Sequence, residues 1–287
     1  MRMLGSIVAA LALPQPIASH SVAPPPARPF SIPFELYKGH IFISAWVNGR
    51  GPYRFGFDTG ASGIGRADAA LTAELGLPGA GTVANSDGVT STQSDLVAVR
   101  SLRVGDIERT GIALPSRDYN KGRKPGEQPM MGIIGRDFFG DRVVTVDYPA
   151  RTITFGGKAL RRGGRGVVAY GDGFAIPLCF ASGCYPGKVD TGSSRGLVIP
   201  KDVVARISAG APTLVGQAAR TNGAATLYAV PLREPVGMGK ASFAVATALY
   251  AEPSTDAINV GSDFLKDYVL TIDPQRHLLR IGAPARE

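Results

Sequence analysis

The sequence predicts a mostly β protein built from two homologous lobes with a cleft between them. Three observations support this fold class. At 287 residues, the chain is near the length at which one hydrophobic core divides into two domains. It contains 37 glycines and 22 prolines but few apolar patterns of helical period, which favours a turn-rich β architecture over a helical bundle. The third observation is an internal repeat.

The repeat consists of two blocks that occur in the same order in both halves. Residues 133–156 align without gaps with residues 259–282, at an offset of 126 (Gly135 to Gly261). Upstream, the eleven residues from Phe55 match those from Gly187 at an offset of 132 (58 to 190). Such self-similarity indicates a duplicated structural unit.

The boundary between the two units is predicted within residues 157–166, after the first repeat has ended and before the second begins. This division gives a signal peptide over 1–23, an N-terminal lobe over 24–157 and a C-terminal lobe over 158–287. Each lobe has about 130 residues, an ordinary domain size.

Each half contains the same predicted elements. A hairpin with Gly and Pro at its turns precedes each Asp-Thr-Gly triplet, and a short helix and a long hairpin follow it. We expect Asp137 and Asp263 to cap further short helices. The predicted ranges are 47–57 and 179–189 for the first hairpins, 66–77 and 200–208 for the helices, and 82–99 and 214–230 for the long hairpins.

The N-terminus has the layout of a secretory signal peptide. Arg2 precedes an apolar run over residues 3–13, which ends at Pro14 and is followed by the small residues Ala18 and Ser19. The run is shorter than the 18 or so apolar residues that a membrane span requires. We therefore expect an exported protein, periplasmic or extracellular, without a stable membrane anchor.

The two cysteines, Cys179 and Cys184, flank the turn of a predicted hairpin and would face each other across it. Export would place them in an oxidising compartment, so a disulfide is expected. The three histidines are far apart in sequence and show no ligand spacing. No metal and no cofactor are expected.

The formal net charge is +8, and the basic residues are scattered. The densest cluster, Arg161, Arg162 and Arg165, lies among glycines with no aromatic side chains that could stack on bases. It is predicted to be a solvated linker, and no nucleic-acid partner is expected.

The two Asp-Thr-Gly triplets begin at Asp58 and Asp190, in matching places of the repeat. Each follows a predicted strand, so an approximate twofold axis between the lobes can bring the two loops together. Two adjacent carboxylates share one proton and titrate as a pair. The ionised member can take a proton from water as it attacks a peptide carbonyl, while the protonated member donates one.

The segments FDTGAS and VDTGSS, each followed downstream by an apolar-apolar-glycine element, resemble the pepsin and retropepsin superfamily of aspartic peptidases. The bacterial retropepsin-like type, with two fused lobes, is the most similar, and the resemblance spans residues 30–282. It implies a bilobal pepsin-like fold and a monomeric aspartic endopeptidase that cleaves extended polypeptides. The implied catalytic pair is Asp58 and Asp190. The implied supporting residues are Thr59, Gly60, Thr191, Gly192 and Ser193 beside the pair, and Ile133, Ile134, Gly135, Val260 and Gly261 in the strands that brace the loops.

Two features depart from this pattern or compete with it. Asn259 stands where the superfamily has an apolar residue, which leaves the packing of the second bracing strand open. Residues 192–196 also fit the G-x-S-x-G pattern of serine hydrolases, but no helix is predicted directly after them, as that elbow requires.

One functional alternative and one structural question stay open at this stage. A non-catalytic protein that binds peptide or cell-wall material could use the same scaffold. Whether one long hairpin or both close over the cleft is also open.

The charge on the pair is predicted to be unequal. Ser193, three residues after Asp190, can donate a hydrogen bond to the outer oxygen of that carboxylate, whereas the equivalent Ala61 cannot donate one to Asp58. A hydrogen bond to the ionised form favours that form. Asp190 is therefore expected to hold the negative charge and Asp58 the proton.

Overall fold

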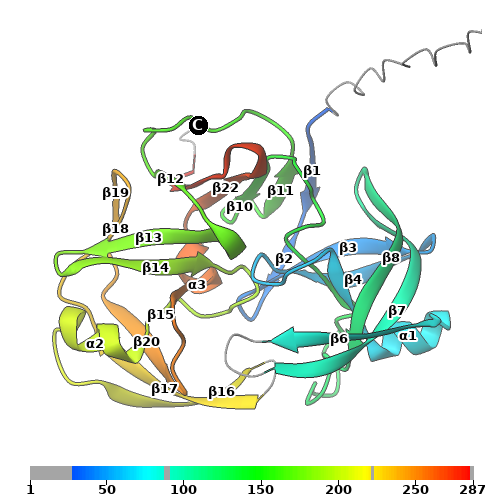
Figure 1. Cartoon of the computed structure of the whole chain (residues 1–287), viewed down its shortest axis with the longest axis horizontal. Helices are drawn as coiled ribbons and strands as arrows, with labels where there is room; N and C mark the ends of the chain where they lie inside the picture. Colours follow the sequence, from blue (N-terminus) through cyan, green and yellow to red (C-terminus); the bar gives the residue numbers. More distant parts are fainter. Residues whose placement is uncertain (1–27, 87–90, 221–222, 285–287) are drawn as a thin grey trace, which may run out of the picture.

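The computed structural model describes residues 28–86, 91–220 and 223–284. It is mostly β, as predicted, and its described strands form three sheets. One sheet lies in each lobe, and the third joins the two halves at the top of the view in Figure 1. The predicted signal peptide lies outside the described residues.

The N-terminal lobe is built on an eight-stranded sheet that curls on itself, because β3 pairs with both β4 and β7. Alternate residues of β3 point into the core, among them Ile41, Ile43 and Ala45. The strands, in sheet order, are β2 (Glu35–Tyr37), β3 (His40–Val47), β4 (Arg50–Phe57), β9 (Gly132–Ile134), β5 (Gly65–Asp68), β8 (Ile107–Arg117), β7 (Ser91–Val104) and β6 (Gly79–Ser86).

The C-terminal lobe repeats this plan in a nine-stranded sheet. Its first hairpin, β13–β14, again precedes the Asp-Thr-Gly triplet, and its long hairpin is β16–β17. The strands, in sheet order, are β16 (Thr213–Arg220), β17 (Gly223–Pro231), β20 (Thr247–Glu252), β15 (Leu197–Val198), β21 (Ile258–Val260), β14 (Gly183–Val189), β13 (Ala175–Phe180), β18 (Val236–Met238) and β19 (Ala241–Phe243).

The third sheet contains three strands from each half and joins them at its centre. There β10 pairs antiparallel with β22, and Thr145 lies opposite its repeat equivalent Thr271. An approximate twofold axis therefore passes through this pair. The strands, in sheet order, are β1 (Phe30–Pro33), β11 (Thr152–Phe155), β10 (Val144–Asp147), β22 (Val269–Asp273), β23 (Leu278–Gly282) and β12 (Val167–Ala169).

Both predicted helices that follow the triplets are present but short. Helix α1 (Ala69–Leu75) begins later than expected because Asp68 ends strand β5 and accepts a hydrogen bond from the amide of Ala70 as the N-cap. Helix α2 (Lys201–Ile207) follows Pro200. The remaining helical segments are α3 (Ser262–Leu265) and the single 3₁₀ turns η1 (Asp172–Phe174) and η2 (Pro274–Arg276).

The expectation that Asp137 and Asp263 cap helices is wrong. Residues 136–141 form turns instead of a helix, and the Asp137 carboxylate accepts a hydrogen bond from the amide of Gly63 (2.9 Å). Asp263 lies inside α3, where it pairs with Lys266. Asp137 therefore connects the turn after β9 to the loop that carries Asp58.

One large hydrophobic cluster extends through both lobes. Near the cleft it contains an aromatic stack in which Phe139 lies between Phe57 and Phe174, with ring centroids 6.3 and 6.5 Å apart. Phe57 directly precedes Asp58, and Phe174 belongs to the second lobe. The loop that carries Asp58 is thus anchored on the packing between the lobes.

The predicted disulfide between Cys179 and Cys184 is present. The two residues lie directly opposite each other in the β13–β14 hairpin, with their Cα atoms 3.9 Å apart. Among the described helices, none has the length and apolar character needed to cross a membrane.

Candidate active site

The loops that carry Asp58 and Asp190 are held in the same way by equivalent strands. Asp58 follows β4, and its amide donates to the carbonyl of Ile134 in the parallel neighbour β9 (3.0 Å). Asp190 follows β14, and its amide donates to the carbonyl of Val260 in the parallel neighbour β21 (3.0 Å). The predicted bracing strands therefore contact the predicted loops.

A glycine ends each bracing strand where the chain returns close to the loop. The amide of Gly135 donates to Ile64 and that of Gly261 to Gly196, both at 2.9 Å. A Cβ on either glycine would overlap a backbone carbonyl of the adjacent loop. Both positions thus require glycine for close packing.

Two buried threonines connect the loops across the lobes. The amide of Thr59 donates to the Thr191 hydroxyl and the amide of Thr191 to the Thr59 hydroxyl, each at 3.0 Å. The hydroxyls in turn donate to carbonyls of the opposite lobe, Thr59 to Val189 (3.0 Å) and Thr191 to Phe57 (2.8 Å). Both side chains are fully buried. The loops therefore form one rigid unit.

Each carboxylate lies against the glycine of the opposite loop. A Cβ on Gly60 would stand 2.5 Å from Oδ1 of Asp190, and a Cβ on Gly192 would overlap the carboxyl of Asp58. The inner oxygens accept amide hydrogens from their own loops, Asp58 Oδ1 from Gly60 (2.8 Å) and Asp190 Oδ1 from Gly192 (3.0 Å). The two acidic groups thus face each other at the floor of one cavity.

Burial is the main cause that raises the pKa of Asp58, to about 7. The negative charge of Asp190 and a hydrogen bond between the two carboxyl groups raise it further, while the amides of Ala61 and Gly60 lower it. The raised pKa keeps the Asp58 carboxyl mostly protonated below about pH 7.

The donor predicted for the outer oxygen of Asp190 is wrong. The Ser193 hydroxyl lies beside Gly261 instead, where a Cβ added to that glycine would stand 2.8 Å from Ser193 Oγ. It accepts a long hydrogen bond from the Arg195 amide (3.4 Å). The side-chain amide of Asn259 donates to Asp190 Oδ2 instead, at 2.7 Å. The backbone of Ser193 also supports the loop, because its amide donates to the carbonyl of Asp190 and its carbonyl accepts from the amide of Ser262.

Two further side chains support the loops from equivalent positions that sequence reasoning overlooked. Arg136 follows Gly135 and donates to the carbonyl of Gly60 (3.1 Å). Ser262 follows Gly261 and donates to the carbonyl of Thr191 (3.1 Å), while the buried hydroxyl of Tyr148 contacts Ser262 (3.0 Å). Their place directly after the repeated glycines was the available signal.

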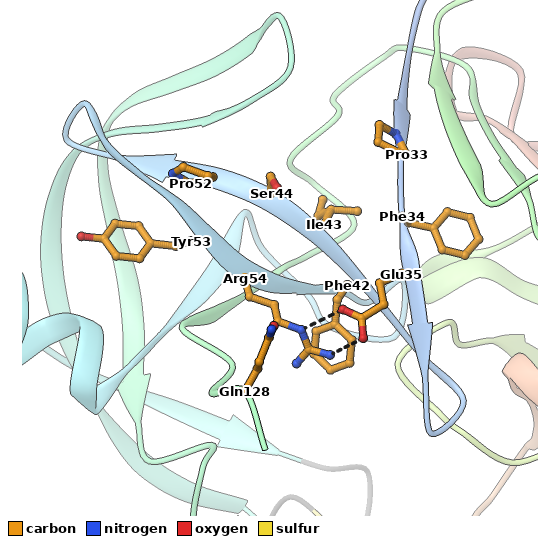
Figure 2. Close-up of a pocket in the computed structure, with 10 residues that line it drawn as sticks. All are labelled: Pro33, Phe34, Glu35, Phe42, Ile43, Ser44, Pro52, Tyr53, Arg54 and Gln128. Atoms are coloured by element: carbon orange, nitrogen blue, oxygen red, sulfur yellow. Dashed lines mark hydrogen bonds and ion pairs between the residues drawn. The ribbon is translucent and has the colours of Figure 1, made fainter. Parts of the chain in front are cut away.

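The cavity around the two aspartates has a volume of about 530 Å³. A second cavity of about 420 Å³, on the side of β3 and β4, shares lining residues with it. A third cavity of about 310 Å³ shares Phe42, Arg54 and Gln128 with the second. Figure 2 shows this outer cavity, where the Arg54 guanidinium forms two hydrogen bonds with Glu35 and lies over the ring of Phe42. Three neighbouring cavities therefore lie in a row from the pair along the first lobe.

The long hairpins β6–β7 and β16–β17 occupy equivalent places in the two lobes, at the lower edge of the view in Figure 1. The tips of both lie outside the described residues. Ser194, the serine of the G-x-S-x-G pattern, is followed by strand β15 instead of a helix. Within the described ranges, no three His, Cys, Asp or Glu side chains gather as metal ligands.

Comparison with known proteins agrees with this arrangement. The aspartyl protease family model matches residues 43–138, in the first lobe. A search of curated proteins finds no match. Among solved structures, the chain is similar to an aspartic proteinase from Irpex lacteus, with a TM-score of 0.54 and 12% identity over 90% of this chain and 98% of that chain. The fold is therefore that of a pepsin-like aspartic proteinase, and with the family match it supports placing the protein in the aspartic peptidase superfamily.

Proposed function

We propose that the protein is an aspartic endopeptidase in which Asp58 and Asp190 activate a water molecule to hydrolyse peptide bonds. The observation that carries this proposal is the reciprocal placement of the two loops, in which each carboxylate lies against the glycine of the other. The threonine bonds between the lobes hold that placement. The aspartyl protease match and the pepsin-like fold support a peptidase function at the coarser level.

The unequal environment of the pair suggests the roles of the two residues. Ionised Asp190 takes a proton from the water whose oxygen attacks the carbonyl carbon, and protonated Asp58 donates its proton to the carbonyl oxygen. The tetrahedral diol collapses as its proton returns to Asp58, the C–N bond breaks, and the proton on Asp190 passes to the leaving nitrogen. The pair ends in its starting protonation state.

The row of cavities suggests an extended polypeptide as the substrate. Three cavities that share lining residues extend from the aspartates past Ile133 to Phe42 and Arg54. An extended chain offers backbone groups along such a row and places one peptide bond over the pair. Because one chain supplies both aspartates, the proposed active unit is a monomer.

Digestion of a denatured protein mixture between about pH 3 and pH 7 tests the proposal. We expect cleavage by the wild-type protein, inhibition by a statine-type compound, and no cleavage by Asp58→Asn or Asp190→Asn, both of which should remain folded because Asn is close in size to Asp. Cleavage that persists in either variant would overturn the assignment of the pair. A peptide library that binds in these cavities but is never cut at any pH would favour a non-catalytic peptide-binding protein on this scaffold.

We further propose that the protein acts outside the cytoplasm. The signal-like N-terminal sequence and the disulfide between Cys179 and Cys184 support an oxidising, exported environment. N-terminal sequencing of the mature protein from the cell envelope and culture medium tests this proposal. An intact N-terminus in a cytoplasmic fraction would contradict it.

A further inference from the structure

We propose that Asn259 is a positioning residue that fixes the negative charge on Asp190 and so sets the acid limit of activity, an inference that rests on the proposed function. Its side-chain amide donates to Asp190 Oδ2 at 2.7 Å, whereas the backbone amides of the two loops donate to the carboxylates at 2.8–3.0 Å. It reaches this oxygen from strand β21, directly beside the loop.

The repeat provides an internal comparison for this contact. Position 259 corresponds to position 133 at the offset of 126, and the two residues pair with the strand before their aspartate in the same register, Asn259 with Lys188 and Ile133 with Gly56. Ile133 lines the same cavity beside Asp58 but has no hydrogen-bonding group. The outer oxygen of Asp190 thus has an amide donor from a position at which the first lobe has a hydrocarbon side chain.

The chemistry of the amide favours one protonation state of Asp190. A hydrogen bond donated to a carboxylate stabilises the ionised form, and one donated to an ion is stronger than one between neutral groups. The opposite orientation of the amide would direct Oδ1 at the carboxylate and suit only a protonated Asp190. The raised pKa of Asp58 agrees with a pair whose proton lies on that residue.

Asn259 also has an unfavourable feature that packing does not explain. Its Oδ1 atom is buried and has no hydrogen-bond partner among the described residues. An unpaired buried carbonyl destabilises the fold, and an apolar residue such as Ile fits the equivalent position of the first lobe. A buried amide oxygen without a partner calls for a specific explanation, and the hydrogen bond that the same amide donates to Asp190 supplies one.

Other charged and titratable groups also face the pair and influence its pKa values. Substitutions at positions 259 and 133 leave these groups unchanged, so a difference between variants is assigned to the exchanged residue. The groups that line the cavity or interact electrostatically with either aspartate are His40, Arg66, Tyr119, Arg136, Tyr148, Lys188 and Asp256. Arg195 interacts electrostatically with His40.

The test is the pH dependence of kcat/KM for wild type, Asn259→Ile, the mirror variant Ile133→Asn and the double exchange. Loss of the amide should raise the acid limb by about one to two pH units, as expected for one charge-assisted hydrogen bond. The double exchange should return the limb toward its wild-type position, because the amide then stabilises charge on Asp58. An acid limb that stays in place in folded Asn259→Ile would overturn the proposal.

A titration that needs no activity separates this inference from the proposed function. Carboxyl ¹³C NMR follows Asp190 in wild type and in Asn259→Ile, with Asn259→Ala as a smaller replacement if the Ile variant does not fold. The apparent pKa assigned to Asp190 should rise in either variant. If wild type cleaves nothing but the titration shifts, the peptidase proposal fails and the effect of Asn259 on the charge of Asp190 stands. If wild type cleaves and the titration does not shift, the role of Asn259 fails alone.

Discussion

Thr59 and Thr191 exchange hydrogen bonds across the two lobes, each backbone amide donating to the hydroxyl of the other at 3.0 Å. Because each hydroxyl also donates to a carbonyl of the opposite lobe, four hydrogen bonds connect two amides, two hydroxyls and two carbonyls. The position of either aspartate therefore depends on both lobes.

We expect Thr59→Val to destabilise the protein and to lower kcat. The change keeps the shape of the side chain but leaves the Thr191 amide and the Val189 carbonyl buried without partners, at about 1–3 kcal/mol for each group. Chemical unfolding measures the loss. Thr59→Ser keeps both hydrogen bonds and is the matched control, so equal destabilisation by Ser and Val would contradict this account.

Gly60→Ala should abolish most activity without unfolding the protein. The new methyl would stand 2.5 Å from Asp190 Oδ1, so the carboxylate must move, and a displacement of about 1 Å at a reacting group can reduce the rate about 100-fold. Gly79→Ala is the control, because a Cβ there meets no atom within 4 Å and the position lies in the same lobe. We expect the control to retain wild-type kcat/KM; loss of activity in both variants would show that the effect is not local.

The duplicated sequence was sufficient to predict the fold and the meeting of the two loops. The resemblance to aspartic peptidases implied which strands would brace Asp58 and Asp190, and the offset of Gly135 to Gly261 placed the two strands in equivalent positions of the repeat. The prediction for Ser193 was wrong because position along the chain does not determine the direction of a side chain. The departure at Asn259 was visible as a polar residue in an apolar pattern, but only the three-dimensional contact gives its partner.

Removal of the disulfide should destabilise the protein but leave its chemistry unchanged. Cys179 and Cys184 close a loop of only six residues, for which the chain-entropy model gives about 2 kcal/mol. We expect Cys179→Ala/Cys184→Ala to lose about this amount in urea unfolding and to keep kcat/KM below its melting range. Reductant should lower the stability of wild type but not of the double variant; a wild type insensitive to reductant would contradict the prediction.

The raised pKa of Asp58 should appear in both stability and activity. An aspartate in the unfolded chain titrates near its ordinary value of about 4, whereas burial and the charge of Asp190 raise the pKa of folded Asp58 to about 7. Between these values the folded state binds more protons than the unfolded state, so this group makes the free energy of unfolding fall as the pH rises from about 4 to about 7. Below about pH 4 both states are protonated, and this stabilising contribution is fully present.

The measurement compares the pH dependence of unfolding for wild type and Asp58→Asn, which cannot ionise at this position. The variant should lose most of the decline between about pH 4 and pH 7, whereas Asp141→Asn, a change at an exposed aspartate, should keep it. In wild type, kcat/KM should fall above about pH 7, because the mechanism needs the proton on Asp58. A stability decline that is equally steep in Asp58→Asn would show that other groups cause it, and the basic limb of activity could then not be assigned to Asp58.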